Sequence, residues 1–287
     1  MTLDRPAMTL LGPLAIRIGP RRQKIPFAGR TRRLFIFLAG HANVSVRRER
    51  LLDELWPDVI PERATSGLNT AIWRIKQGLS SFPGFAIETV DDVIRLAVDH
   101  PARIDCHILE SCVSEATCPG VPVKLPQEHY LRLLTIVKNC CGPFLDGCSD
   151  HWVLPLREKF GALHVRALTL LMRDRAARGK YDAALEHGCA ILELDAFREG
   201  TQREVMWLYA LNGQRAQAIM QFRMLSNLLE HELGIDPMPE TVALYQKIAH
   251  AQDSIADLAR LSLGQGRLDP ALVPAVCVGE HEGIYDQ

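Results

Sequence analysis

Six side chains between residues 69 and 77 carry groups that can read the edges of nucleic-acid bases. The amides of Asn69 and Gln77 pair a donor with an acceptor, as adenine requires, and the cations of Arg74 and Lys76 suit guanine or a phosphate. Trp73 suits a thymine methyl group or a sugar, and equally suits packing on a neighbouring domain. The simplest alternative is a solvated helix face. The six are Asn69, Thr70, Trp73, Arg74, Lys76 and Gln77.

Basic residues are concentrated in the first third of the chain. The 287 residues carry a net charge of −1, but residues 1–98 have a net charge of +6 and residues 99–287 one of −7. Ten Lys and Arg, among them Arg32 and Arg33, lie between Arg17 and Arg50 with a single acid, Glu49. Such a cluster is typical of a protein that binds a polyanion, although many basic faces are only solvated.

No motif for catalysis or for a cofactor is present. The chain lacks His-Glu-x-x-His, the phosphate-binding loop Gly-x-x-x-x-Gly-Lys-Ser/Thr, Gly-x-Gly-x-x-Gly and Gly-x-Ser-x-Gly. The eight cysteines do not follow the pair spacing of structural zinc sites. We therefore predict no catalytic residue, no cofactor and no metal. A thiol or metal sensor built on Cys140 and Cys141 remains an alternative.

Length and composition predict two globular domains. With 47% hydrophobic residues the chain has enough apolar surface for a core in each, without disulfides or metals. The N-terminal apolar run from Met8 to Ile18 is interrupted by Gly12, Pro13 and Arg17, and no stretch is long enough to cross a bilayer. We expect a cytoplasmic protein with reduced thiols and no membrane contact.

Residues 1–98 have the element order of a winged helix-turn-helix. Alternation favours strands at Thr9–Ile18 and Gln23–Phe27, and apolar stripes favour helices at Thr31–Ala42, Arg48–Trp56 and Pro61–Leu79. In the third helix Leu68, Ile72, Ile75 and Leu79 form the expected buried face. A hairpin of Ala86–Thr89 and Val93–Val98 closes the domain. In this fold the third helix enters the major groove of DNA and the hairpin reaches phosphate.

The remainder of the chain is predicted to be helical and repetitive. Prolines break residues 99–139 into a linker and short helices, and helical patterns are nearly continuous from Trp152. The segment that begins at Gly179 recurs at Gly213, an offset of 34 residues that is the tetratricopeptide period. We expect the fold class to be mainly α, with the winged helix-turn-helix followed by an all-α tetratricopeptide-like domain at 104–251 and a tail at 252–287.

Four stretches resemble the SARP-type bacterial regulators. In that family an OmpR-like winged helix precedes a bacterial transcriptional activator domain of tetratricopeptide-like helices. The similarity extends from about Thr9 to Ala251, and the Leu-Gly-Ile-Asp-Pro ending is its most specific element. The four stretches are Leu11-Gly-Pro-Leu14, Arg50-Leu-Leu-Asp-Glu-Leu-Trp56, Leu68-Asn-Thr-Ala-Ile-Trp-Arg-Ile-Lys-Gln-Gly-Leu79 and Glu230-His-Glu-Leu-Gly-Ile-Asp-Pro237.

The resemblance implies binding to promoter repeats and recruitment of RNA polymerase holoenzyme to activate transcription. It carries DNA contact onto Arg74 and Lys76, which match basic positions of the family's recognition helix. Where the family's wing usually reads Gly-Tyr-Arg, this chain has Val93-Ile94-Arg95 after two acids, so a phosphate contact by Arg95 is expected to be weakened. The resemblance places the polymerase-facing loop at Pro57, Asp58, Val59, Ile60 and Pro61.

These observations favour a transcription regulator of the bacterial nucleoid. Residues 1–98 are expected to bind promoter DNA, and the helical domain to provide a homodimer contact or a surface for a protein or peptide partner. Only about eight residues precede the first predicted strand, so we expect no phosphoacceptor domain ahead of it. The alternative from another class is a helical-repeat adaptor that never touches DNA, which the acidic wing and acidic helical domain favour.

Overall fold

A computed structural model describes residues 8–18, 21–23, 26–80, 82, 84–100, 104–117, 124–140 and 142–250. The described residues fall into two compact units. The first contains the residues up to 120 together with 127–167, and the second contains 121–126 together with the residues from 168 onward.

The first unit begins with a small antiparallel sheet of order β1-β2-β3, formed by Met8–Thr9, Ala15–Ile18 and Arg21–Gln23. The predicted strand Thr9–Ile18 is therefore split, because Gly12 adopts a φ of 110° beside Pro13. The partner strand begins earlier than predicted, since Ile18 pairs with Arg21. Of the predicted extension to Phe27, Lys24 and Ile25 lie outside the described residues, and Pro26 and Phe27 are not part of the sheet, since Pro26 has no N–H to donate to a ladder.

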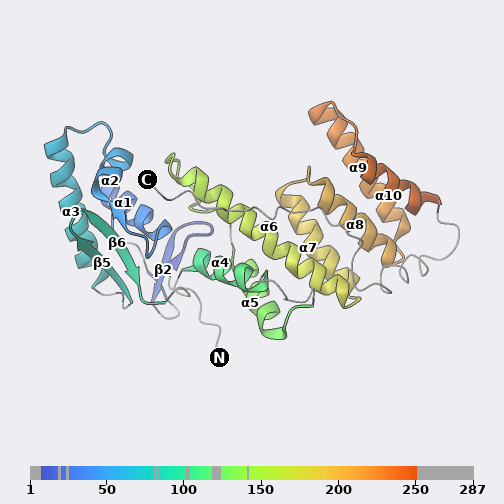
Figure 1. Cartoon of the computed structure of the whole chain (residues 1–287), viewed down its shortest axis with the longest axis horizontal. Helices are drawn as coiled ribbons and strands as arrows, with labels where there is room; N and C mark the ends of the chain where they lie inside the picture. Colours follow the sequence, from blue (N-terminus) through green and yellow to red (C-terminus); the bar gives the residue numbers. More distant parts are fainter. Residues whose placement is uncertain are drawn as a thin grey trace, which may run out of the picture. The chain divides into compact units, whose positions relative to one another are not determined.

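Three helices and a second sheet follow (Figure 1). They are α1 (Gly29–Gly40), α2 (Arg48–Leu55) and α3 (Pro61–Leu79), with β4 (Val46–Arg47), β5 (Phe85–Val90) and β6 (Val93–Val98) in an antiparallel sheet of order β4-β6-β5. The predicted stripe of α3 is buried at all four positions: Leu68, Ile72, Ile75 and Leu79. This is the winged helix-turn-helix that the sequence predicts.

The helices α4 (Asp105–Ala116) and α5 (Gln127–Asn139) and the first part of α6 (Val153–Ala177) belong to the same unit. The buried carboxylate of Asp105 joins α4 to the β1 segment. It accepts hydrogen bonds from the backbone N–H groups of Leu10 at 2.8 Å and Leu11 at 3.0 Å. The Leu145 N–H also donates to the Leu10 carbonyl oxygen at 2.7 Å. The winged helix therefore packs as one body with the segment that follows it.

The second unit is a helical repeat. The end of α6 packs on α7 (Tyr181–Leu194) through Met172, α8 (Glu199–Leu211) pairs with α9 (Arg215–Leu233), and α10 (Pro239–His250) packs on α8 and α9. The predicted turn glycines Gly179 and Gly213 have φ values of 68° and 74°, and Gly234 caps α9 in the left-handed conformation. Cores centred on Met172 and Met206 hold successive helices together. The mainly α fold class is thus confirmed.

Some sequence predictions lie outside the described residues, namely the tail 252–287, Cys118, Cys141 and Cys277. The sequence predicts one domain that ends at residue 98 and another that begins at residue 104, each expected to fold independently. The two units are defined instead by which residues pack together, so they do not test these boundaries, which stay a prediction. In the described part of the chain, no helix is both long enough and apolar enough to cross a membrane.

Candidate nucleic-acid interface

The outer face of α3 is polar and open to solvent. Its opposite face is buried against the rest of the winged helix, where Ala64, Leu68 and Ala71 lie among the core residues. With 19 residues the helix is long enough to present several turns to a ligand. The structure brings the six predicted base-reading residues together here, and all six are exposed: Asn69, Thr70, Trp73, Arg74, Lys76 and Gln77.

One of these side chains is oriented by a neighbour from α2. Arg48 Nη1 donates a hydrogen bond of 2.8 Å to Asn69 Oδ1. A guanidinium has donors only, so the amide oxygen of Asn69 must face Arg48, and the orientation of the amide is fixed. Sequence reasoning assigned Asn69 a base contact but missed Arg48, because the two residues are brought together only by the packing of α2 on α3.

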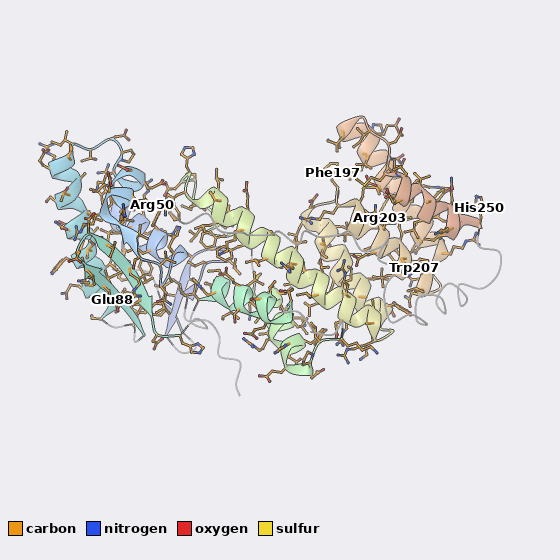
Figure 2. All side chains as sticks on the ribbon, viewed as in Figure 1. Arg50, Glu88, Phe197, Arg203, Trp207 and His250 are labelled. Atoms are coloured by element: carbon orange, nitrogen blue, oxygen red, sulfur yellow. The ribbon has the colours of Figure 1, made fainter. Side chains whose placement is uncertain are left out.

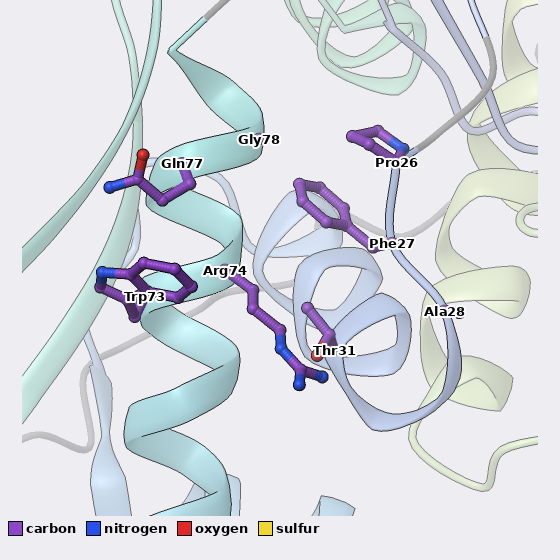
Figure 3. Close-up of a pocket in the computed structure, with 8 residues that line it drawn as sticks. All are labelled: Pro26, Phe27, Ala28, Thr31, Trp73, Arg74, Gln77 and Gly78. Atoms are coloured by element: carbon purple, nitrogen blue, oxygen red, sulfur yellow. The ribbon is translucent and has the colours of Figure 1, made fainter.

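Trp73 is 61% exposed and lies near the centre of this face. Together with Arg74 and Gln77 it lines a hollow of about 540 Å³ between α3 and the start of α1 (Figure 3). The Phe27 ring forms part of the opposite wall, 5.0 Å from the ring of Phe35. Within the first unit Trp73 is therefore open to a ligand and does not contribute to the core.

A second hollow of about 610 Å³ continues along the same edge of α3. The two hollows share Ala28, Thr31 and Arg74, so they form one groove between α1 and α3. Arg30 and Arg63 line the second hollow, and neither hollow has an Asp or Glu in its lining. We call these two adjoining hollows the α1–α3 groove. Its walls combine apolar side chains such as Phe27 and Trp73 with three arginines, Arg30, Arg63 and Arg74.

Sequence reasoning missed Arg63 and Ser66 and included Arg30 only as one of the ten basic residues between Arg17 and Arg50. A signal was available for α3. Arg63, Ser66, Thr70 and Arg74 recur at intervals of three and four residues, which places them along one edge of a helix. No sequence pattern indicates that α1 lines the groove, because the packing of its N-terminus against α3 depends on the tertiary structure.

The two predicted arginines of α1 have different surroundings. Arg32 is exposed. Arg33 is half-buried and donates two hydrogen bonds to Asp150, from Nε at 2.9 Å and from Nη2 at 2.6 Å. This forked pair neutralises Arg33 and joins α1 to the segment that precedes α6.

The wing carries the last predicted contact, Arg95 (Figure 2 labels its partner Glu88 on β5). Arg95 stands opposite Glu88 in the register of β5 and β6, and its Nε donates to Glu88 Oε2 at 3.0 Å. Both side chains remain about half exposed, at 42% and 45%. Asp91 and Asp92 form the turn beyond them, so the wing tip is acidic, as the sequence indicated.

The predicted polymerase-facing loop, residues 57–61, connects α2 to α3. Pro57, Asp58 and Pro61 are exposed, Val59 is half-buried, and Ile60 is 57% exposed. The preceding Trp56 is buried and anchors the loop; a Cβ on Gly67 of α3 would lie 2.9 Å from its indole nitrogen. The loop thus presents an apolar side chain on a well-anchored base.

The cysteines of the described segments show no metal cluster. No group of three or more His, Cys, Asp or Glu among the described residues could hold an ion. Cys106 and Cys112 are buried free thiols, and burial raises the pKa of each, which lowers the fraction of reactive thiolate at neutral pH. The sensor hypothesis on Cys140 and Cys141 stays a prediction, since Cys141 lies outside the described residues.

Comparisons with known proteins agree with this architecture. Residues 137–249 match the bacterial transcriptional activator domain family. The chain is 24% identical over 256 residues to the transcriptional regulatory protein MoaR1 of Mycobacterium tuberculosis, covering 83% of this chain and 78% of that protein. It is 24% identical over 262 residues to the regulatory protein DnrI of Streptomyces peucetius, covering 86% of this chain and 93% of that protein.

A solved structure shares the fold. The structure of Mycobacterium tuberculosis EmbR in complex with a low affinity phosphopeptide superposes with a TM-score of 0.70 at 20% sequence identity, over 91% of this chain and 69% of that one. The relatives are transcriptional regulators rather than enzymes. With its activator-domain match over residues 137–249, its relatives and its winged helix followed by helical repeats, this chain is similar to the SARP-type bacterial transcriptional regulators.

Proposed function

We propose that this regulator binds promoter DNA in a sequence-specific manner, with α3 in the major groove. The observation that carries the proposal is the outer face of α3, on which six polar or aromatic side chains are exposed together while the opposite face is buried. An α-helix fits the major groove of B-DNA, where each base pair shows a distinct pattern of donors and acceptors. The exposed set includes both amides and cations, which are the groups that read that pattern.

Charge supports DNA as the ligand. The α1–α3 groove beside the helix contains three arginines and no acid in its lining. The exposed acids of this domain lie elsewhere, for example at Glu62 in the first turn of α3 and at the wing tip. Phosphate contacts made by these arginines would give binding that weakens steeply as salt increases.

Activation would require a second contact, with RNA polymerase. Residues 57–61 suit this role, because Ile60 is exposed on a loop held at both ends by prolines and by the buried Trp56. An exposed apolar side chain on a short, anchored loop can bind a partner with little loss of conformational entropy. Ile60→Ser should reduce transcription from a bound promoter without reducing occupancy of that promoter.

The experiment selects binding sites from a randomised DNA library with the wild-type protein, and then measures affinity for the selected site by fluorescence anisotropy. The double variant Arg74→Ala with Lys76→Ala should lose affinity by about 1–3 kcal/mol for each contact removed. Arg166→Ala is the matched control, since Arg166 is exposed on α6, outside the groove lining. A wild-type protein that enriches no common motif would refute the proposal.

A protein-binding role for the helical repeat is the second candidate. Leu194, Phe197 and Met238 are 56%, 41% and 53% exposed. The Met238 N–H donates to Glu199 Oε2 at 2.9 Å, which holds the start of α10 near the residues that follow Phe197. Exposed apolar groups gathered in this way favour a peptide or protein partner. If Phe197→Ser abolished the cellular response while Arg74→Ala with Lys76→Ala did not, the adaptor role would replace the DNA-binding one.

A further inference from the structure

The N-terminus of α1 lacks a protein cap. Its N-cap residue is Ala28, no side chain caps the helix, and the first turn contains no acid. The Arg32 N–H donates to the Ala28 carbonyl oxygen at 3.3 Å, and the N–H groups of the three preceding residues have no partner among the described residues. Unsatisfied N–H groups and the positive end of the helix dipole attract an anion.

Thr31 provides an independent indication of a ligand at this helix end. It is only 6% exposed, lines both hollows of the α1–α3 groove, and has no hydrogen-bond partner for its hydroxyl among the described residues. Figure 3 shows it beside the guanidinium of Arg74. The Thr31 residue is nearly buried, but its hydroxyl oxygen is not closed off from solvent, so the hydroxyl can donate a hydrogen bond to an acceptor that enters the groove.

The cations of the groove define the charge of that acceptor. Arg74 reaches across from α3 toward Thr31, and Arg30 and Arg63 line the adjoining hollow. Guanidinium groups and helix N–H groups together are the donors that bind a tetrahedral oxyanion. The groove lies along one edge of α3, which is where a strand of the DNA backbone would pass if that helix occupied the major groove.

We propose that the α1–α3 groove binds one phosphate of the DNA backbone, through the N–H groups of Gly29–Thr31, the Thr31 hydroxyl and the guanidinium of Arg74, with Arg30 and Arg63 beside it. This inference rests on the proposed function and makes it more specific. Arg74 suits either guanine or a phosphate, and this inference assigns it to phosphate. The contact fixes the depth and register of α3 in the groove without reading sequence.

The test measures affinity for the selected DNA site over a range of salt concentrations for Thr31→Val, Arg30→Ala and Arg63→Ala. Thr31→Val keeps the shape of the side chain and breaks no protein hydrogen bond, so it should melt at the wild-type temperature and bind DNA about 3- to 10-fold more weakly. Thr31→Ser should restore binding. Each arginine variant should lower the slope of log affinity against log salt by about one. All three should weaken matched and mismatched DNA equally.

Controls separate this inference from the proposed function. Thr117, at the end of α4, and Arg166, on α6, lie outside the groove lining. The control variants Thr117→Val and Arg166→Ala should therefore bind DNA as tightly as the wild type does. Wild-type binding that is unchanged in Thr31→Val and the arginine variants would overturn the phosphate site alone. Failure of the wild type to bind any DNA would overturn both. Shifts of the Gly29–Thr31 amide signals with inorganic phosphate, without any effect of the variants on DNA binding, would assign the site to a free anion and overturn the DNA assignment.

Discussion

Two groups of arginines in the first unit have opposite surroundings. Arg33 donates two hydrogen bonds to Asp150, and Arg157 donates to the carbonyl oxygens of Phe144, Leu145 and Cys148. Arg30, Arg63 and Arg74 instead line the α1–α3 groove, which has no acidic residue in its walls. Charge alone does not separate the two groups. In the first group Arg33 joins α1 to the segment before α6 and Arg157 holds that segment on α6, whereas the second group leaves its donors available for a ligand.

The largest expected effect is on the stability of the first unit, in which polar side chains hold the winged helix on the segment that follows it. Asp105→Ala removes the acceptor for the N–H groups of Leu10 and Leu11, and both residues are buried. Each orphaned N–H costs about 1–3 kcal/mol, so the unfolding free energy of the first unit should fall by about 2–6 kcal/mol. Urea unfolding measures this, with the exposed Asp53→Ala as control. A loss below 1 kcal/mol would contradict the assigned role of Asp105.

The same carboxyl predicts a pH dependence. Burial raises the pKa of Asp105 from 3.8 to about 6, against the opposing effect of hydrogen bonds from Leu10 and Leu11. A raised folded-state pKa favours the neutral acid, so this contribution to stability is fully present below pH 3.8 and is lost as pH rises through about 6. Relative to Asp105→Asn, the wild type should lose about 2 kcal/mol between pH 4.5 and 7. A difference that stays constant over that range would exclude the raised pKa.

The sequence predicted the helix that carries the interface. The expected bounds of α3, Pro61 to Leu79, are those observed, because Pro is favoured in a first turn and the apolar stripe has a single period throughout. The hairpin and the 34-residue repeat also followed from local patterns. Such features depend on residues close in the chain, where the periodicity of side chains is sufficient evidence.

The partners of individual arginines did not follow from the sequence. Asp150 lies 117 residues from Arg33, and no local pattern connects them. Arg33 was therefore grouped with Arg32 as a DNA-binding residue, although the structure shows it paired. The α1–α3 groove was missed for the same reason, since it requires the N-terminus of α1 to lie against the edge of α3. These are tertiary facts that composition and spacing do not contain.

A pair of adjacent variants sharpens the comparison with a moderate effect. Arg33→Ala should lower the unfolding free energy by about 1 kcal/mol, because it breaks a partly buried forked ion pair. Its effect on DNA affinity should be small under conditions in which the variant is fully folded. Arg32→Ala should leave stability unchanged and weaken DNA binding through a lost phosphate contact. Urea unfolding and anisotropy on the same preparations separate the two. Equal effects of both variants on both measurements would remove the distinction.

The wing gives the smallest expected effect and the most direct contrast between a paired and a released arginine. Glu88→Gln removes the charge that holds Arg95, and because the pair is about half exposed, stability should change by less than about 0.5 kcal/mol. DNA affinity should rise about twofold at low salt, since an acid is removed near phosphate and Arg95 is released toward it. Arg95→Gln is the matched variant and should lower affinity by a similar factor. If Glu88→Gln weakened binding instead, the ion pair with Glu88 would be holding Arg95 in the position from which it contacts DNA. An arginine of the wing could then pair within the protein and contact DNA at the same time, in contrast to what we expect for Arg33.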